Sequence, residues 1–244
     1  MILMDCGNSQ LKAQYWRSGQ LQDNYAHAYS EGWENTLVEW LEVQGGSQCY
    51  LCSVLDSERQ GRLDTVLASV FPDGITRFST VAEAFGVVNG YTNPAQLGID
   101  RWLALLAAAE FVDGDCFIID AGSAITLDLL DIERKHLGGA ILPGCGTSLD
   151  EFKRIFSYID FSAPEIAESE EPGSSTAAAI QIDCALSSIE ALSELLNRWS
   201  TRLSDNPTIL LAGGDAYHVQ RELKLASRIV PDLVFRGMLR MINA

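Results

Sequence analysis

The segment Ile2-Leu3-Met4-Asp5-Cys6-Gly7-Asn8-Ser9 has the same pattern as Phe117-Ile118-Ile119-Asp120-Ala121-Gly122-Ser123-Ala124. Each is an apolar run that ends in Asp-x-Gly and continues with small residues, and almost half the chain separates the two aspartates. Such a run is typical of a buried strand, and glycine permits a sharp turn at its end. Successive N–H groups in that turn can converge on an anion, beside hydroxyls and a carboxylate. The repeat therefore predicts a duplicated fold that holds one polyphosphate from two sides, as a phosphoryl-transfer protein would.

The composition indicates an ordinary globular protein of one large or two modest domains. The chain has 244 residues, of which 47% are apolar. No apolar run approaches the ~20 residues that span a bilayer. The N-terminal segment lacks the basic region of a signal peptide, and Asp5 interrupts what would be its apolar part. We therefore expect a cytoplasmic protein with no membrane partner.

Charge and cysteine content exclude several kinds of site. A net charge of −16 opposes binding to nucleic acid, which needs clustered Lys and Arg. With few cations available, a nucleotide has to be held by backbone amides, hydroxyls and metal ions. The pair Cys49–Cys52 is a CxxC without a second pair or a nearby histidine, whereas structural zinc normally needs four ligands. We expect the six cysteines to be buried, reduced thiols.

The pattern of apolar residues and turn signals predicts alternating strands and helices in a mixed sheet flanked by helices. We place the domain boundary near residue 114, giving domains 1–114 and 115–244. Residues 91–101 are expected to form a loop, and the acidic stretch 163–175 either a mobile lid or a solvated surface loop. The expected strands are 2–6, 11–17, 21–28, 48–54, 75–78, 116–120, 124–131, 135–142 and 208–212. The expected helices are 33–43, 55–70, 102–111, 148–156, 176–199 and 232–242.

Three ordered features resemble the fold shared by actin, sugar kinases and heat-shock chaperone ATPases. They are the repeated Asp-x-Gly, the hydroxyls of Ser9, Ser123 and Thr126, and the pair Gly213-Gly214 after a strand. The resemblance implies an α/β protein with two ribonuclease H-like domains and a nucleotide cleft between them. Neither GxxxxGK[ST] nor GxGxxG after a strand occurs in the chain, which disfavours the other common nucleotide-binding folds.

Over nearly its whole length the chain also resembles the type III pantothenate kinases. The most family-specific part is Gly98-x-Asp100-Arg101 before a helix rich in Ala and Leu. The residues that carry the resemblance are Asp5-Cys-Gly-Asn-Ser-Gln-Leu-Lys12, Tyr91-Thr-Asn-Pro94, Leu97-Gly-Ile-Asp-Arg101, Asp120-Ala-Gly-Ser-Ala-Ile-Thr-Leu-Asp128, Gly138-Gly-Ala-Ile-Leu-Pro-Gly144 and Ala212-Gly-Gly214.

This resemblance implies an activity, cofactors and a partner. The enzyme would use ATP to phosphorylate pantothenate to 4′-phosphopantothenate, the first step toward coenzyme A. It would need Mg²⁺ or another divalent cation, together with K⁺ or NH₄⁺. It would be a homodimer whose substrate pocket lies near the subunit contact.

By resemblance, one group of residues binds ATP and metal ions. Asp5 suits Mg²⁺, directly or through water, and Asp120 matches the position that holds the monovalent cation. Lys12 either adds a point charge or is a solvent-facing strand residue. The expected contacts to ATP are Asp5, Cys6, Gly7, Asn8, Ser9, Gln10, Leu11, Lys12, Ser123, Gly213 and Gly214.

A second group surrounds the acceptor substrate. By resemblance Asp100 is the base that accepts the proton of the substrate hydroxyl, although a carboxylate there can also cap the following helix. Arg101 can pair with the pantothenate carboxylate in bidentate fashion. Thr176 supplies a hydroxyl or is a plain N-cap. The expected substrate contacts are Tyr91, Gly98, Ile99, Asp100, Arg101 and Thr176.

The sequence departs from the family pattern in two ways and leaves alternatives open. Ser9 and Ser123 stand where threonine is common, which keeps the hydroxyl, and Ala212 stands where threonine is frequent. The alternatives are a kinase of the same fold acting on a sugar, an acetyl-type or another small anionic substrate, an accessory regulatory protein, or a catalytically dead binding module. An arginine beside the base favours an anionic substrate, and intact aspartates at 5, 100 and 120 oppose a dead module.

Overall fold

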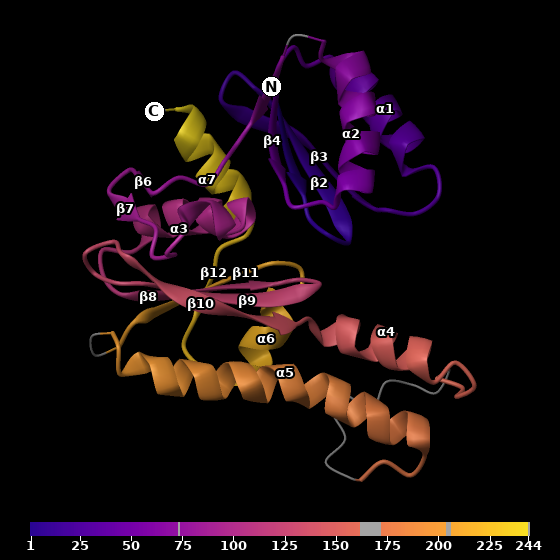
Figure 1. Ribbon diagram of the computed structural model, residues 1–244, viewed down its shortest axis with the longest axis vertical. Coiled ribbons are helices and arrows are strands. Elements are labelled where there is room, and N and C mark those ends of the chain that lie inside the picture. The colour runs from indigo at the N-terminus through magenta and orange to yellow at the C-terminus, as the bar shows by residue number, and fades with distance from the viewer. Residues whose placement is uncertain (73, 162–171, 204–205, 244) are drawn as a thin grey trace. The chain divides into compact units, whose positions relative to one another are not determined.

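The computed structural model describes residues 1–72, 74–161, 172–203 and 206–243 (Figure 1). Their contacts divide the chain into two compact units. Unit 1 comprises Met1–Glu110 with Leu233–Ala244, and unit 2 comprises Phe111–Asp232. The predicted acidic loop 163–175 lies mostly outside the described residues. None of the described helices is long and apolar enough to cross a bilayer.

Unit 1 contains a five-stranded mixed sheet in the order β3-β2-β1-β4-β5. The central strand β1 pairs antiparallel with β2 and parallel with β4. β3 is antiparallel to β2, and β5 is parallel to β4. The strands are β1 (Ile2–Cys6), β2 (Gln10–Arg17), β3 (Gln20–Ala28), β4 (Cys49–Ser53) and β5 (Ile75–Arg77).

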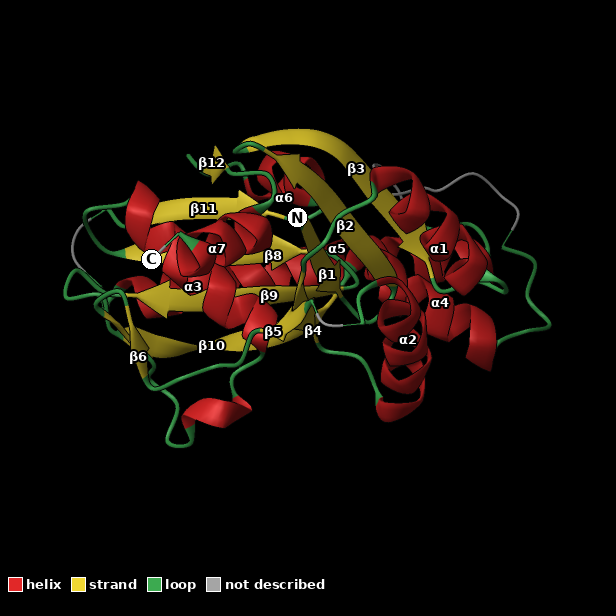
Figure 2. Ribbon diagram, turned by 90° about the horizontal axis from the view of Figure 1, so that it is seen from above, coloured by secondary structure: helices red, strands yellow, loops and turns green. Residues whose placement is uncertain are grey.

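Unit 2 repeats this sheet with the same order and the same strand directions. The order is β10-β9-β8-β11-β12, with β8 antiparallel to β9 and parallel to β11 (Figure 2). The strands are β8 (Cys116–Ala121), β9 (Ala124–Leu130), β10 (His136–Pro143), β11 (Thr208–Ala212) and β12 (Arg228–Ile229). The predicted α/β fold with a duplicated, ribonuclease H-like sheet is therefore confirmed.

Helices accompany each sheet, with a small hairpin and a 3₁₀ turn before α3. In unit 1 they are α1 (Trp33–Gln44), α2 (Ser57–Val70), α3 (Ile99–Phe111, its last residue counted in unit 2) and α7 (Leu233–Ile242). In unit 2 they are α4 (Cys145–Ile155), α5 (Thr176–Ser200) and α6 (Ala216–Leu223). The hairpin is β6 (Glu83–Ala84) with β7 (Val87–Val88), and the 3₁₀ turn η1 spans Pro94–Gln96.

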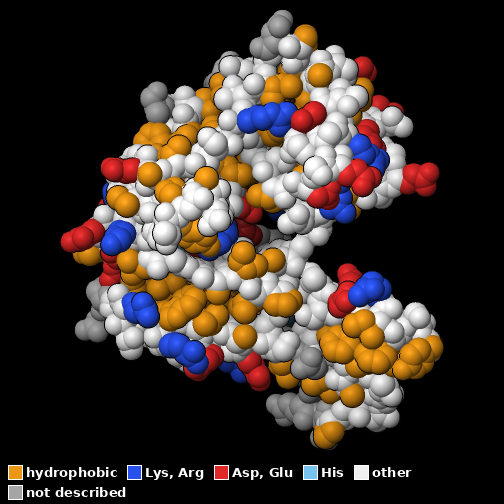
Figure 3. All heavy atoms as spheres, viewed as in Figure 1, with side chains coloured by type: hydrophobic (Ala, Val, Ile, Leu, Met, Phe, Trp, Pro, Cys, Tyr) orange, Lys and Arg blue, Asp and Glu red, His pale blue; other side chains and the backbone are white. Residues whose placement is uncertain are grey.

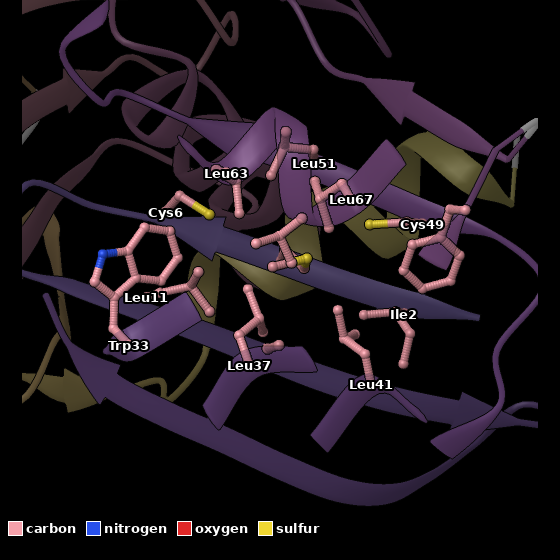
Figure 4. Close-up of a cluster of buried hydrophobic side chains, with 14 residues drawn as sticks. Ile2, Cys6, Leu11, Trp33, Leu37, Leu41, Cys49, Leu51, Leu63 and Leu67 are labelled. Carbon is pink, nitrogen blue, oxygen red and sulfur yellow. The ribbon is translucent and has the colours of Figure 1, made fainter. Parts of the chain in front are cut away.

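The core of unit 1 fixes which way Asp5 faces. Alternate residues of β1, namely Ile2, Met4 and Cys6, pack with leucines of α1 and α2 such as Leu37 (Figure 4). Because successive side chains of a strand point to opposite faces, Asp5 lies on the other face of the sheet. The apolar pattern of β1 therefore both buries the strand and directs its one carboxylate away from the α1–α2 core.

Helix α7 packs in unit 1, although it follows unit 2 in sequence. It contacts β1, and a Cβ atom on Gly237 would lie 2.1 Å from the carbonyl oxygen of Leu103 in α3. Glycine therefore lets the two helix backbones approach closely. Arg240 of α7 also pairs with Glu110, 3.2 Å away. The predicted domains 1–114 and 115–244 remain a prediction, and the compact units differ from them in the placement of α7.

Two expected element boundaries were wrong near the site. Helix α3 begins at Ile99, so Asp100 and Arg101 lie in its first turn and not in the preceding loop. The carbonyl oxygen of Gly98 already accepts the hydrogen bond of Trp102 N, at 2.9 Å. Helix α4 begins at Cys145, directly after β10, where a longer turn was expected. Helix α6 and strand β12 were not predicted, because segments this short have too few residues to show a period of apolar residues in the sequence.

Candidate functional site

The first Asp-x-Gly forms a tight turn between β1 and β2, which we call turn 1 (Gly7–Ser9). Gly7 N donates to Gln10 O at 3.1 Å, and the side chains of Asn8 and Ser9 are exposed. A Cβ atom on Gly7 would meet only Gln10 O, at an ordinary 3.5 Å, and the backbone there has no positive φ. Neither the packing nor the backbone conformation of the protein therefore requires glycine at position 7.

The second Asp-x-Gly forms the equivalent turn between β8 and β9, which we call turn 2 (Gly122–Ser123). Gly122 N donates to Ala124 O at 3.0 Å. As at Gly7, nothing crowds Gly122, whose Cβ would come no closer than 3.9 Å to another atom. In both turns the glycine amide donates to the first residue of the following strand, although turn 2 is one residue shorter, and in both the glycine Cβ position is open.

Two other glycines are required by the packing around turn 2. A Cβ atom on Gly144 would lie 2.2 Å from Gly122 O. Gly213 has φ +90, and its Cβ would lie 2.2 Å from Ala121 O and 2.5 Å from Asp120 Oδ1. A side chain at either position would displace the turn or the aspartate. Gly214, by contrast, has open space around its Cβ position.

Asp5 lies in a row of polar side chains that crosses the sheet of unit 1. It is opposite Lys12 in β2 and opposite Cys52 in β4, so the three residues share one face. Burial raises the pKa of the Cys52 thiol well above its usual value, and the negative charges of Asp5 and Asp100 raise it further. Because both carboxylates act on this one thiol, Asp5 and Asp100 belong to the same neighbourhood of unit 1.

Asp100 is held at the start of α3 with its carboxylate against the backbone. Its Oδ1 accepts a hydrogen bond from Arg101 N at 2.8 Å. A Cβ atom on Gly98 would lie only 2.5 Å from that same oxygen. The missing side chain of Gly98 therefore provides the space that the carboxylate occupies.

Arg101 is a buried cation oriented by Tyr91. Its side chain is 6% exposed, Nη1 donates to the Tyr91 hydroxyl at 2.8 Å, and the guanidinium lies 5.6 Å from the centroid of the Tyr91 ring. Tyr91 is fixed in turn because its amide donates to the side chain of buried Asn89 at 3.0 Å. The structure thus brings Tyr91, Gly98, Asp100 and Arg101 together.

Asp120 is the second-to-last residue of β8, the central strand of the second sheet. It is opposite Thr126 in β9 and Ala212 in β11. Its carboxylate is half-buried, and carboxylate oxygens suit a hard cation. Among the described residues, no group of three or more His, Cys, Asp or Glu forms a ready metal cluster. Any metal here has to complete its shell with backbone oxygens, water or substrate.

Thr176 is the first residue of α5, and it is exposed. The N-cap is the preceding residue, because the Ser175 hydroxyl accepts a hydrogen bond from Ala178 N at 3.1 Å. The alternative that Thr176 is a plain N-cap is therefore wrong, and its hydroxyl has no capping task.

The expected site residues form one group in each unit, and the structure adds several that the sequence did not suggest. Unit 1 contains turn 1 and the carboxylates of Asp5 and Asp100, and unit 2 contains turn 2 and Asp120. Asn89, Gly144 and Cys52 support these groups. Gly144 and Cys52 could not be recognised from a local pattern because they contact residues that are distant in sequence. Asn89 could not be recognised because its side chain accepts a backbone amide, which does not depend on the identity of its neighbour.

Comparison with known proteins gives a consistent result. A family model described as Type III pantothenate kinase matches residues 1–198. A relative named type III pantothenate kinase, from Pseudomonas aeruginosa (strain LESB58), is 36% identical over 248 residues, covering 98% of this chain and 97% of the relative.

Solved structures show the same fold. A structure titled conserved putative Baf family transcriptional activator, from Campylobacter jejuni, has a TM-score of 0.58 at 20% identity, covering 100% of this chain and 98% of that one. A putative 2-dehydro-3-deoxygalactonokinase from Sinorhizobium meliloti has a TM-score of 0.62 at 16% identity, covering 99% and 95%. At these identities the likeness concerns the fold alone.

Proposed function

Because this chain belongs to the type III pantothenate kinase family, we propose a role in its reaction for each group of site residues. The chain is a kinase that phosphorylates pantothenate with ATP in coenzyme A biosynthesis. The observation that carries this conclusion is the 36% identity over 98% of the chain. The arrangement of Gly98, Asp100 and Arg101 supports it in chemical terms.

We assign the two turns to the phosphates of ATP. Phosphoryl transfer depends on positioning and on charge stabilisation more than on covalent chemistry. Gly7 and Gly122 are glycines that the packing of the protein does not require, which is expected where a backbone must approach a ligand closely. With a net charge of −16, backbone amides in the turns are a suitable means to hold an anion. Ser9 and Ser123 add hydroxyls, and Lys12 adds a cation beside Asp5.

The aspartates near the ends of the two central strands, Asp5 and Asp120, are our candidates for the metal ions. Magnesium is usually bound through one or two carboxylates together with substrate phosphates and water, and Asp5 beside turn 1 supplies such a carboxylate. When bound, the divalent cation neutralises charge on the phosphates. Asp120 is our candidate ligand for K⁺ or NH₄⁺. Packing against Asp120 already requires glycine at position 213, and we propose that Gly213 and Gly214 contact ATP.

Asp100 is the proposed general base. Its carboxylate would accept the proton of the pantothenate hydroxyl as that oxygen attacks the γ-phosphorus of ATP, and ADP leaves. Its Oδ1 accepts a hydrogen bond from the Arg101 amide, which orients the carboxyl group at the start of α3. The base is thus held in one orientation by the backbone of α3 and by the space at Gly98.

Arg101 is the proposed partner of the pantothenate carboxylate. A guanidinium can form two parallel hydrogen bonds to a carboxylate, which lysine cannot. The hydrogen bond that Arg101 donates to the Tyr91 hydroxyl, together with the nearby Tyr91 ring, holds this guanidinium in one position, so less conformational entropy is lost on binding. A cation beside the base favours an anionic acceptor over a neutral sugar. Thr176, free of a capping task, is proposed to bind pantothenate through its hydroxyl.

A homodimer is the proposed assembly. On the face seen in Figure 3, hydrophobic side chains gather over α4 and the residues after it, where Ile155 is 54% exposed and Tyr158 80% exposed. The rings of Phe152 and Phe156 stack beside them, with centroids 5.9 Å apart. Exposed apolar groups of this kind mark interaction surfaces. A cytoplasmic location, and the lack of nucleic-acid or membrane partners, stay predictions from the composition.

An assay of ADP release tests the function. We expect turnover that requires pantothenate and ATP together, falls when K⁺ is replaced by Na⁺, and stops when divalent cations are chelated. ADP release that does not depend on pantothenate, with a sugar or another small acid as acceptor, would point to a kinase of the same fold with another substrate. No turnover with any acceptor would favour an accessory regulatory role.

A further inference from the structure

The third residue after each aspartate has its carbonyl group held by a side chain from outside the turn. In turn 1 this residue is Asn8, and its carbonyl oxygen accepts a hydrogen bond from Arg59 Nη1. In turn 2 the equivalent residue is Ser123, and its carbonyl oxygen accepts one from Thr147 Oγ1, at 2.5 Å. Counted from the aspartate, the two contacts involve the same carbonyl, although turn 2 is one residue shorter and the donors differ in type.

Arg59 is itself fixed by its surroundings on α2. Its guanidinium lies 5.2 Å from the centroid of the Tyr29 ring, and its Nε is 3.6 Å from Asp56, the residue that caps α2. Asp56 accepts the amides of Glu58 and Arg59. The guanidinium is therefore attached to a rigid helix end, although its side chain is 40% exposed.

Thr147 belongs to the first turn of α4, which meets turn 2 through its backbone as well. Gly144 N donates to Ser123 O at 3.0 Å, and Thr147 N donates to Gly144 O at 3.0 Å. The Ser123 carbonyl thus accepts one backbone and one side-chain hydrogen bond. The close approach at Gly144 leaves turn 2 little room to move on this side.

Holding a carbonyl fixes the next amide, because the peptide unit is planar and trans and its C=O and N–H point in opposite directions. We propose that Arg59 and Thr147 are equivalent positioning residues, which orient the amides of Ser9 and Ala124 toward the phosphates of ATP. This inference rests on the proposed role of the two turns in binding ATP. It gives Arg59 on α2 and Thr147 on α4 a role in nucleotide binding.

The test compares matched variants of the full chain. Thr147→Val removes the hydroxyl at nearly constant volume, and Thr147→Ser retains it. Arg59→Ala is matched by Arg62→Ala, since Arg62 is on the same helix, lies 5.7 Å from the Trp33 ring and pairs with Glu34, away from turn 1. The measurements are the KM for ATP and for pantothenate, kcat, and the Kd of ATP by calorimetry without pantothenate.

We expect Thr147→Val and Arg59→Ala each to raise the KM and Kd for ATP about five- to tenfold, the scale of one hydrogen bond. The KM for pantothenate should change less than about twofold, and Thr147→Ser and Arg62→Ala should behave like the unchanged protein. Equal weakening in Thr147→Val and Thr147→Ser, or equal ATP affinity in Arg59→Ala and Arg62→Ala, would overturn the proposal. If ATP binding changes as expected but turnover needs no pantothenate, the proposed function fails and this inference stands.

Discussion

A Cβ atom on Gly98 would lie 2.5 Å from Asp100 Oδ1, so the proposed base occupies space that only glycine leaves open at residue 98. The crowded atom belongs to the end of a side chain and not to the backbone. A larger residue at 98 can therefore be accommodated by moving the carboxylate, with the fold intact. This relationship separates an effect on catalysis from an effect on folding.

We expect Gly98→Ala to lower kcat by about tenfold or more, because misplacement of a catalytic group by about 1 Å can cost up to about a hundredfold. The melting temperature should change little. Gly61→Ala in α2 is the control, since nothing lies within 4 Å of its Cβ position. Unchanged kcat in Gly98→Ala would show that the space at this position does not matter for the base.

Asp100→Asn should lower kcat by about 10²–10⁴, the range for loss of general acid–base catalysis. The shape of the side chain is retained, so the Kd of ATP should stay near that of the unchanged protein. Stopped-flow or coupled assays of ADP release measure the first quantity and calorimetry the second. Near-normal turnover would show that Asp100 is not the base and has only a structural role at the start of α3.

Arg101→Lys should raise the KM for pantothenate because a single ammonium replaces a bidentate fork. A neutral analogue, with the carboxylate reduced to an alcohol, gives the decisive comparison. The unchanged protein should prefer pantothenate strongly over this analogue, and the variant should lose most of that preference. Tyr91→Phe, which removes the hydroxyl that accepts the 2.8 Å hydrogen bond from Arg101, should show a smaller change in the same direction. An undiminished preference in Arg101→Lys would reject the carboxylate contact.

Ser175→Ala should affect stability and Thr176→Ala should affect substrate binding. Ser175 caps α5, so its replacement should lower the free energy of unfolding by about 1 kcal/mol without changing the KM for pantothenate. Thr176→Ala should raise that KM and leave the stability nearly unchanged. Chemical denaturation and steady-state kinetics measure the two quantities. The reverse result would show that Thr176 has a structural role only.

The buried cysteines should resist alkylation in the native protein. Burial raises the pKa of Cys49 and of Cys116 to about 12, and it raises the pKa of Cys6 and Cys52 well above the usual value. Since the thiolate is the reactive form, iodoacetamide at pH 8 should label these four residues only after unfolding. Peptide mass spectrometry would detect the difference. Rapid native labelling of Cys49 and Cys52 would contradict the assignment of this CxxC as buried and inert.

Much of the fold could be predicted from short patterns. The apolar runs that end in Asp5-Cys-Gly7 and Asp120-Ala-Gly122 indicated two buried strands with equivalent turns, and the two sheets confirm the duplication. Asp56, near the start of the expected helix 55–70, caps α2, as an aspartate at a helix start commonly does. These features depend on neighbouring residues, so a local pattern is sufficient to reveal them. The roles of the site residues remain predictions from the family resemblance.

The sequence by itself determined the family, the repeated strand and turn, and the residues from Gly98 to Arg101. Only the tertiary structure decided that Cys52 faces Asp5, that α7 packs against β1, and that Arg59 and Thr147 hold equivalent carbonyls. The physical reason is that strand period, turn geometry and capping are set within a few residues. A hydrogen bond from α2 to Asn8, or a close approach of Gly237 to Leu103, exists only once packing has brought distant segments together.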